Sequence, residues 1–431
     1  MARFVITGGK RLSGSVAVSG MKNAATPILA ATLLASGPCI IRNVPRISDV
    51  DRMLELLQML GVAVRWQQEH VVEVDPRGFN PSVVLVAGRN GAFKTHPFAA
   101  AIKAMRSSVL LLGPLLARLD EFPFVEPGGD IIGNRPLDTH LEAFRRLGVA
   151  VEREDGVLWF RRQHLVGGRV VLPEFSVTAT ENVLMAATAG QHPTEIHLAA
   201  AEPHVADLVR FLRSLGVNIA GEGTHTLRVE GARMLSSADH TLIPDQLEVG
   251  TFAVAAAATR GELLIHGCEP THLDSVLSRL EAAGVRTQWE GKSLRVFGSP
   301  HLSAFRLQAL PYPGFPTDLQ APFAVLATQC QGTSLIHDPL FEGRLGYVSE
   351  LVKMGANAVV CDPHRVLVTG PTPLYGTEIH APDIRAGATL VLAALVASGQ
   401  SIIHNAEVLD RGYEHIEQRL QALGADIKRE Q

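Results

Sequence analysis

The sequence has few aromatic residues and no excess of positive charge, and each shortage excludes a class of binding surface. Aromatic residues make up 5% of the 431 positions, too few to suggest a surface that stacks nucleic-acid bases. Lysine and arginine number 39 against 43 aspartates and glutamates, a net charge of −4. No overall positive field therefore draws the chain to nucleic acid or anionic lipid, and an anion must bind at a local cationic site.

Cysteines and long apolar runs are also scarce. The four cysteines are scattered: Cys39, Cys268, Cys330 and Cys361. They form no Cys-x-x-Cys pair, which is typical of a reducing compartment. His266 and His272 flank Cys268 without a compact ligand set, so we expect no metal site. The longest apolar runs, Ser108–Leu119 and Ala388–Ser398, are shorter than the roughly 20 residues of a membrane span. With no signal-peptide core at the N-terminus, we expect a soluble, cytoplasmic protein.

Internal repeats organise the chain. An apolar-x-x-apolar-Gly helix end, followed by an apolar strand start, occurs six times: at Gly61, Gly148, Gly216, Gly284, Gly355 and Gly424. Four apolar runs with the same spacing end in histidine: His197, His266, His337 and His404. Three glycines precede residue 240 and three follow it. We therefore predict an α/β protein of two similar domains with three βαβ-type units each, and a ligand in the cleft between them.

Three segments depart from this repeat and carry polar side chains that suit chemistry. Lys22 and Asn23 precede a helix that we expect to begin near Ala24, where an ammonium meets a ligand anion or solvent. The Gly- and Pro-rich loop Glu126–Asp138 is a catalytic lid or a polar turn. Pro311–Phe323 delivers Thr317 and Asp318 rigidly to a helix start, so Asp318 is a general base or merely a helix cap.

Cationic side chains are the last feature that stands out. Asp383 and Asp410 are close enough in sequence to neutralise Arg385 and Arg411, which favours ordinary ion pairs. In a chain of net charge −4, however, the whole set suggests one converging site for a polyanion. The set is Lys22, Arg106, Arg135, Arg344, Arg385 and Arg411.

These segments resemble the enolpyruvyl transferases, in order and over almost the whole chain. The matching motifs are VSGMKNAATPILAATLLASG, PGGDIIGNRPLDTHL, FSVTATENVLMAA, IPDQLEVGTF, PYPGFPTDLQAPF, FEGR, DIRAGATLVLAAL and DRGYEHIEQRLQALGA. The resemblance implies a two-domain inside-out α/β barrel with three βαβαββ repeats per domain. It also implies that Met1–Met21 joins Ile243–Gln431 in one domain, and that Lys22–Leu242 forms the other with the lid loop Glu126–Asp138.

Within that family the motifs resemble the members whose acceptor is UDP-N-acetylglucosamine. The implied reaction moves the enolpyruvyl group of phosphoenolpyruvate to the sugar 3-hydroxyl and releases phosphate, without metal or organic cofactor, at the start of peptidoglycan synthesis. By resemblance the catalytic residues are Lys22, Asp130, Asp318 and Arg411, with Asp318 as hydroxyl base and Asp130 as proposed acid. The implied substrate-binding residues are Lys22, Asn23, Arg106, Arg135, Pro136, Leu137, Asp138, Thr139, Glu174, Phe175, Ser176, Val177, Asp318, Leu340, Arg344, Arg385 and Arg411.

Three positions depart from the family pattern. Asp130 stands at the lid position that is cysteine in most members, Gln246 follows Pro-Asp where arginine is usual, and Ala201 replaces another arginine. Two alternatives remain: an enolpyruvyl transferase for another acceptor such as shikimate 3-phosphate, and a catalytically silent paralogue that binds a UDP-sugar. Lys22-Asn23 and the lid loop argue against the first alternative, and the retained cations argue against the second.

Overall fold

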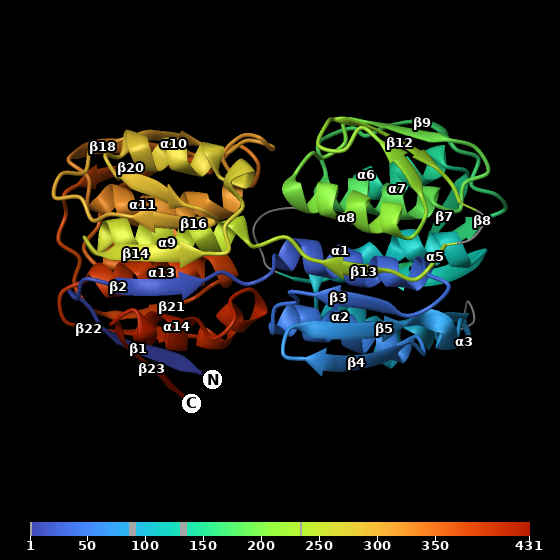
Figure 1. The fold of residues 1–431 in the computed structure, drawn as a ribbon, viewed down its shortest axis with the longest axis horizontal. Coiled ribbons are helices and arrows are strands. Elements are labelled where there is room, and N and C mark those ends of the chain that lie inside the picture. Colours follow the sequence, from blue (N-terminus) through green and yellow to red (C-terminus); the bar gives the residue numbers. More distant parts are fainter. Residues whose placement is uncertain (1, 86–91, 130–135, 233–234) are drawn as a thin grey trace. The chain divides into compact units, whose positions relative to one another are not determined.

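The chain folds as two compact units, each described by itself (Figure 1). The structure is a computed structural model that describes residues 2–85, 92–129, 136–232 and 235–431. Within these ranges, unit 1 comprises residues 2–19 and 244–431, and unit 2 comprises residues 20–129 and 136–243. The sequence predicted crossings after Met21 and after Leu242, whereas the contacts divide the chain after Ser19 and after Ile243.

Unit 1 repeats one βαβαββ order three times. In each repeat the first strand pairs in parallel with the second, which pairs antiparallel with the fourth, and the fourth pairs antiparallel with the third. The first repeat is β2 (Ser13–Ala17), α9 (Gln246–Ala258), β14 (Glu262–His266), α10 (Asp274–Ala282), β15 (Thr287–Glu290) and β16 (Ser293–Val296). The second is β17 (Arg306–Gln308), α11 (Gln320–Thr328), β18 (Gly332–His337), α12 (Tyr347–Lys353), β19 (Asn357–Asp362) and β20 (Arg365–Gly370). The third is β21 (Glu378–His380), α13 (Ile384–Val396), β22 (Gln400–His404), α14 (Ile416–Ala422), β23 (Asp426–Glu430) and β1 (Arg3–Thr7).

Unit 2 follows the same order with one departure. Two repeats are complete. The first is β13 (Asp239–Thr241), α1 (Lys22–Ala31), β3 (Cys39–Arg42), α2 (Ser48–Met59), β4 (Ala63–Gln68) and β5 (Val71–Asp75). The second is β9 (Gly168–Val171), α7 (Val177–Ala187), β10 (Thr194–His197), α8 (Pro203–Ser214), β11 (Asn218–Ala220) and β12 (Thr226–Glu230). Between them, the described residues form α3 (Ser82–Leu85), α4 (Pro97–Lys103), the 3₁₀ helix η4 (Arg106–Leu111), α5 (Leu112–Arg118), β6 (Glu121–Val125), α6 (Asp138–Arg146), β7 (Val149–Glu154) and β8 (Val157–Arg162). This middle sheet, β6-β8-β7, has three strands in the described chain, where the others have four.

The repeat glycines end helices as predicted. Each follows an outer helix (α2, α6, α8, α10, α12 or α14) with a φ between +83° and +105°, the left-handed region that only glycine adopts without a Cβ penalty. The four repeat histidines are the last residues of β10, β14, β18 and β22. Both patterns mark the same positions in successive repeats, so the predicted βαβαββ architecture is confirmed.

The core of unit 1 is a set of three buried helices enclosed by sheets, visible in Figure 1 as α9, α11 and α13. All residues of α9 and α11 are buried, and the three helices contact one another. Helices that are apolar all round need cover on every side, which the surrounding sheets provide. In unit 2, α5 packs against α7, and η4 contacts both α1 and α7.

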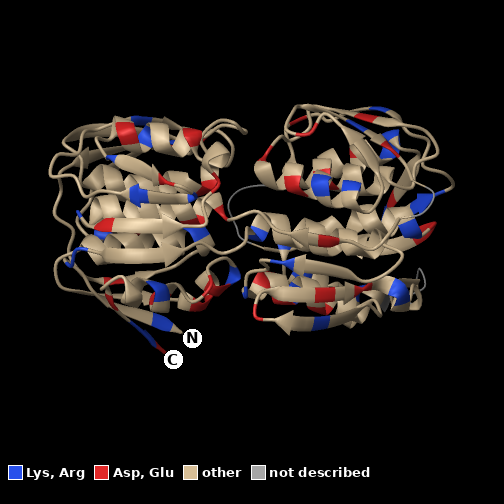
Figure 2. Ribbon diagram, in the orientation of Figure 1, with Lys and Arg blue, Asp and Glu red and all other residues tan. Residues whose placement is uncertain are grey.

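Charged residues of the unit 1 core helices lie only in the first turn. Glu248 is the third residue of α9, Arg385 is the second of α13, and α11 has no charged residue, so most of each helix is tan in Figure 2. Buried charges require nearby partners. The fold therefore confines the charges of these helices to their N-terminal ends.

No single helix among the described residues is long and apolar enough to cross a bilayer. The adjacent segments Pro97–Lys103 and Arg106–Arg118 reach the required length and composition only when taken together, and they meet at a bend of 119°.

Candidate functional site

The clearest constellation in unit 1 surrounds Asp318. Its carboxylate accepts a hydrogen bond from Arg344 Nη2 at 2.7 Å and forms an ion pair with Arg385 Nε at 3.2 Å. Their side chains are 17%, 11% and 9% exposed, respectively. Asp318 lies in the 3₁₀ turn η6 (Thr317–Leu319) before α11, and neither η6 nor α11 has a side-chain cap. The interpretation of Asp318 as a helix cap is therefore wrong, because its carboxylate faces two guanidinium groups.

Arg385 is held from several sides. Its Nη1 donates to the hydroxyl of Tyr413 at 3.2 Å, and that hydroxyl lies 3.0 Å from Thr251 Oγ1 of α9. Burial alone would lower the pKa of Arg385, but the nearby negative charges of Asp318 and Asp245 contribute to a net increase. The guanidinium therefore stays charged inside the unit. Sequence reasoning did not identify Tyr413 or Thr251, although both stand in the quoted motifs, because neither side chain carries a charge.

Asp245, at the start of α9, is another charged residue near Arg385. Its carboxylate caps α9, accepting from the backbone N–H groups of Leu247 at 2.7 Å and Glu248 at 3.4 Å. Complete burial raises its pKa to about 6, against the opposing effect of Arg385. The neighbouring Gln246, the departure noted in the sequence, is also buried.

The alternative in which Asp383 and Asp410 neutralise Arg385 and Arg411 is wrong, because both carboxylates have other partners. Asp383 caps α13 by accepting from the backbone N–H groups of Arg385 and Ala386. Asp410 pairs with Arg429, whose two terminal nitrogens lie 2.8 and 2.6 Å from its oxygens. Arg411 itself is half-buried at the end of the 3₁₀ helix η7 (Ala406–Arg411).

In unit 2, Lys22 is the first residue of α1, so the predicted helix start near Ala24 is two residues too late. Its ammonium lies 2.6 Å from Asp49 Oδ2 of α2, and Arg52 approaches the other oxygen of Asp49 at 3.6 Å. Asp49 is 2% exposed and Lys22 13% exposed. The Lys22 side chain is therefore paired with a buried carboxylate, and the expectation of a solvated loop lysine is wrong. Asn23 is the second residue of the same helix.

The other predicted residues of unit 2 also lie at helix starts. Arg106 begins η4, and Asp138 and Thr139 begin α6 directly after Pro136 and Leu137. Thr139 Oγ1 donates to Glu174 Oε1 at 2.8 Å, which joins two predicted segments. Phe175 is exposed, and Ser176 caps α7, whose first residue is Val177.

His140 was not predicted, although it follows Thr139. It is 2% exposed, its Nε2 lies 2.9 Å from Thr178 Oγ1, and its Nδ1 has no hydrogen-bond partner among the described residues. Burial lowers its pKa to about 3, and the charge of Arg106 acts in the same direction. His140 is therefore neutral at physiological pH. Its position on the apolar face of α6 would have suggested only a core residue.

The lid loop is only partly within the described chain. Asp130 and Arg135 lie outside the described residues, so their predicted roles are not tested. At the start of the loop, a Cβ at Gly128 would lie 2.0 Å from the Lys103 carbonyl oxygen, and one at Gly129 would lie 2.8 Å from Arg106 Cβ. Close backbone approach thus requires these two glycines.

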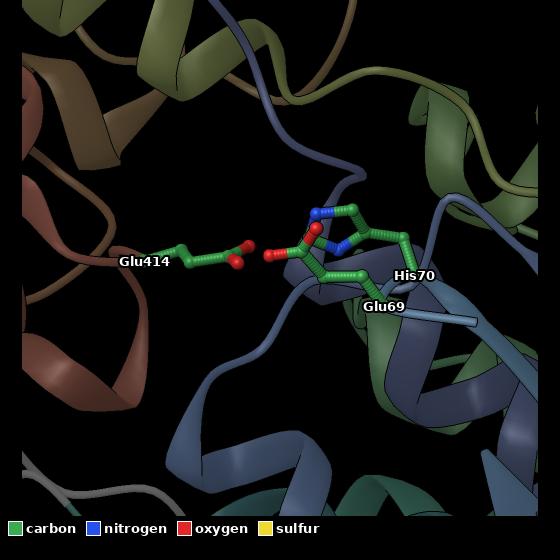
Figure 3. A group of neighbouring side chains, drawn as sticks. All are labelled: Glu69, His70 and Glu414. Carbon is green, nitrogen blue, oxygen red and sulfur yellow. The ribbon is translucent and has the colours of Figure 1, made fainter.

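A cation could in principle be held by clustered carboxylates and imidazoles. Figure 3 draws Glu69 and His70, which belong to unit 2, and Glu414, which belongs to unit 1. Because these side chains come from separate units, they provide no cation site within either one. His70 Nδ1 lies 3.1 Å from the carbonyl oxygen of Val44.

Comparison with known proteins gives a consistent result over the whole chain. The family model described as EPSP synthase (3-phosphoshikimate 1-carboxyvinyltransferase) matches residues 6–420. The UDP-N-acetylglucosamine 1-carboxyvinyltransferase of Koribacter versatilis is 42% identical over 434 residues, covering 100% of this chain and 96% of that protein.

Solved structures agree with this match. The enolpyruvyl transferase NikO from Streptomyces tendae has a TM-score of 0.88 at 27% identity and covers 100% of this chain and 99% of its own. EPSP synthase from Acinetobacter baumannii has a TM-score of 0.73 at 19% identity, covers both chains fully and supports the fold alone. The chain therefore belongs to the EPSP synthase family of enolpyruvyl transferases, within its group of UDP-N-acetylglucosamine 1-carboxyvinyltransferases.

Proposed function

We propose that this chain transfers the enolpyruvyl group of phosphoenolpyruvate to the 3-hydroxyl of UDP-N-acetylglucosamine and releases phosphate. This reaction is the first committed step of peptidoglycan synthesis. The observation that carries the proposal is the buried Asp318 carboxylate beside Arg344 and Arg385, in a chain that matches this group of transferases over its full length. A cytoplasmic location and a part in cell-wall biogenesis, cell shape, cell cycle and cell division follow from the same proposal.

Asp318 would accept the proton of the attacking hydroxyl. A carboxylate oxygen serves as a general base when it is fixed within hydrogen-bond reach of that proton. Arg344 and Arg385 fix Asp318 before substrate binds. An anionic substrate that drew one guanidinium toward itself would open a lone pair of Asp318 to the hydroxyl. The arginines would then orient the base and also bind the anion.

The reaction proceeds by addition and then elimination. The sugar oxygen forms a bond to C2 of phosphoenolpyruvate while an acid, assigned to Asp130, protonates C3. The carboxylate left on Asp130 would then take a proton back from C3, which restores the C2–C3 double bond as the C2–O bond to phosphate breaks. Lys22, Arg135 and Arg411 would contact phosphoenolpyruvate, with Arg344 and Arg385 in the same site, and their positive charge would offset the negative charge of its carboxylate and phosphate.

The sugar nucleotide would be held mainly by residues of unit 2. Asn23 would contact the sugar, and Arg106 would contact an anionic group. The remaining contacts would come from Arg135, Pro136, Leu137, Asp138, Thr139, Glu174, Phe175, Ser176 and Val177, with Asp318 and Leu340 from unit 1. The hydrogen bond from Thr139 to Glu174 supports this grouping, because it holds two of these segments together.

One assay separates this proposal from the alternatives. Phosphate release from phosphoenolpyruvate is measured with UDP-N-acetylglucosamine and, in parallel, with shikimate 3-phosphate. We expect release only with the sugar nucleotide. Release with shikimate 3-phosphate alone would favour the other acceptor, and calorimetric binding of UDP-N-acetylglucosamine without any release would favour a silent paralogue.

A further inference from the structure

Asp338 connects two segments of unit 1 to which the proposed function gives roles. It directly follows β18, and its residue surface is 0% exposed. One carboxylate oxygen, Oδ2, accepts a hydrogen bond from Thr317 Oγ1 at 2.5 Å. The other, Oδ1, accepts from the backbone N–H of Leu340 at 3.0 Å. Thr317 immediately precedes the proposed base Asp318, and Leu340 is a proposed sugar-nucleotide contact.

The backbone of Asp338 is itself anchored. Its N–H donates to the carbonyl of His364 at 2.8 Å, and its carbonyl accepts from His364 Nδ1 at 2.8 Å. The backbone N–H of His364 donates to Asp362 Oδ1 at 2.9 Å, which holds the turn between β19 and β20. Asp338 therefore ties the segments of Thr317 and Leu340 to the turn between the antiparallel strands β19 and β20.

We propose that Asp338 is a positioning residue of the transferase reaction. Through Thr317 it sets the place of the Asp318 carboxylate, and through the Leu340 N–H it sets the loop that meets the sugar nucleotide. One buried side chain thus fixes the position of the proposed base relative to the bound sugar nucleotide. This inference rests on the proposed function of Asp318 and Leu340. Displacement of a reacting group by about 1 Å can cost on the order of 10²-fold in rate, so such a residue matters without touching substrate.

Three variants divide this role into its parts. Thr317→Val removes only the hydrogen bond from Thr317 to Asp338, which positions the proposed base. We expect kcat to fall about tenfold or more while KM for UDP-N-acetylglucosamine stays within about twofold. Asp338→Ala removes the hydrogen bonds to both Thr317 and Leu340, so kcat should fall and KM should rise several-fold. Asp338→Asn can still accept from the Leu340 N–H and can donate to Thr317 Oγ1. It should therefore retain most of the activity.

Thr328→Val is the matched control. Thr328 is a buried threonine at the other end of α11, and its hydroxyl donates to the Val325 carbonyl. Its loss should lower the melting temperature as much as Thr317→Val does, without changing kcat or KM. A purely structural Asp338 would instead give variants whose melting temperatures fall while both constants stay near those of the wild type.

The outcomes are distinguishable. If Thr317→Val and Asp338→Asn both keep wild-type constants while Asp338→Ala is merely unstable, the positioning role is wrong. If the wild-type chain releases no phosphate with UDP-N-acetylglucosamine, both the proposed function and this inference are wrong. The proposal is supported if the wild type is active and Thr317→Val lowers kcat without raising KM. Asp338→Asn must also retain most of the activity, and Thr328→Val must leave both constants unchanged.

Discussion

Lys22 Nζ lies 2.6 Å from Asp49 Oδ2, so the lysine assigned to phosphoenolpyruvate is also the partner of a buried carboxylate. The pairing places a fixed positive charge at the start of α1, where the helix dipole would otherwise disfavour it. Under the proposed function, removal of Lys22 would therefore change both ligand binding and stability.

Lys22→Ala should therefore lose both activity and stability. We expect turnover to fall on the order of 10²-fold or more, as a charged substrate contact is lost. The free energy of unfolding should fall by about 1–3 kcal/mol, because the buried Asp49 carboxylate loses its ion pair with Lys22 at 2.6 Å, which is closer than its contact with Arg52 at 3.6 Å. Phosphate-release kinetics and thermal melts measure the two effects. The double variant Lys22→Ala with Asp49→Asn should recover the melting temperature but not the activity. Recovery of activity would contradict the substrate role of Lys22.

Arg411→Ala tests a second proposed contact of phosphoenolpyruvate. Because Arg411 stands at the half-buried end of η7, we expect turnover to fall on the order of 10²-fold with a smaller change in stability than for Lys22→Ala. Arg365→Ala is a suitable control, since that arginine pairs with Asp362 at an exposed turn of the same unit. Equal turnover of the two variants would argue against the role of Arg411.

Asp318→Asn should abolish turnover and leave the sugar nucleotide bound. Asparagine keeps the shape of the side chain and one acceptor oxygen for the arginines, but it cannot take up the hydroxyl proton. Isothermal calorimetry with UDP-N-acetylglucosamine would measure binding, and phosphate release would measure turnover. Glu281→Gln, which removes an exposed carboxylate from α10 of the same unit, is the control and should stay active. Normal catalysis by Asp318→Asn would leave that carboxylate with a structural role alone.

Asp130 leads to a prediction about inhibition. Fosfomycin is an epoxide that alkylates the lid cysteine of usual family members, and a thiolate is a far better nucleophile than a carboxylate. Because Glu126–Asp138 contains no cysteine, we expect the wild-type enzyme to resist fosfomycin. Asp130→Cys should show time-dependent covalent inactivation, detected as a mass increase in the presence of UDP-N-acetylglucosamine. An adduct on wild-type Asp130 would refute the resistance. Asp130→Ala should be nearly inactive if Asp130 is the acid, and a fully active variant would leave the lid residue a positioning role only.

His140 should make the stability of the protein sensitive to acid. The folded protein keeps His140 neutral down to about pH 3, whereas the unfolded chain takes up the proton near pH 6.5. Between these values the unfolded state binds more protons, so the free energy of unfolding falls as the pH is lowered from 6.5. A single group of this kind contributes a loss of about 2 kcal/mol by pH 5.

Urea unfolding of the full chain at several pH values would measure this loss. His140→Gln should weaken the dependence between pH 6.5 and 5, whereas His192→Gln, at an exposed histidine of the same unit, should not. An unchanged dependence in His140→Gln would show that His140 is not the buried group that titrates.

Local physical chemistry was enough to predict the repeats of this fold. Gly61 and Gly424 end helices because the left-handed conformation has no Cβ penalty at glycine, and this preference depends only on neighbouring residues. His337 and His404 end strands because the apolar pattern before each of them stops there. The helix start at Lys22 was misplaced by two residues, since no capping side chain marks it.

Partner choice, by contrast, was decided only by the tertiary structure. Asp383 and Asp410 are near Arg385 and Arg411 in sequence, yet one caps a helix and the other pairs with Arg429. Asp318 instead meets Arg344, in the turn before α12, and Arg385, in the first turn of α13. The sequence by itself determined which residues carry charge and where the repeats begin. Which charges meet depends on distances through space, and these exist only after the buried helices pack with their N-terminal ends together.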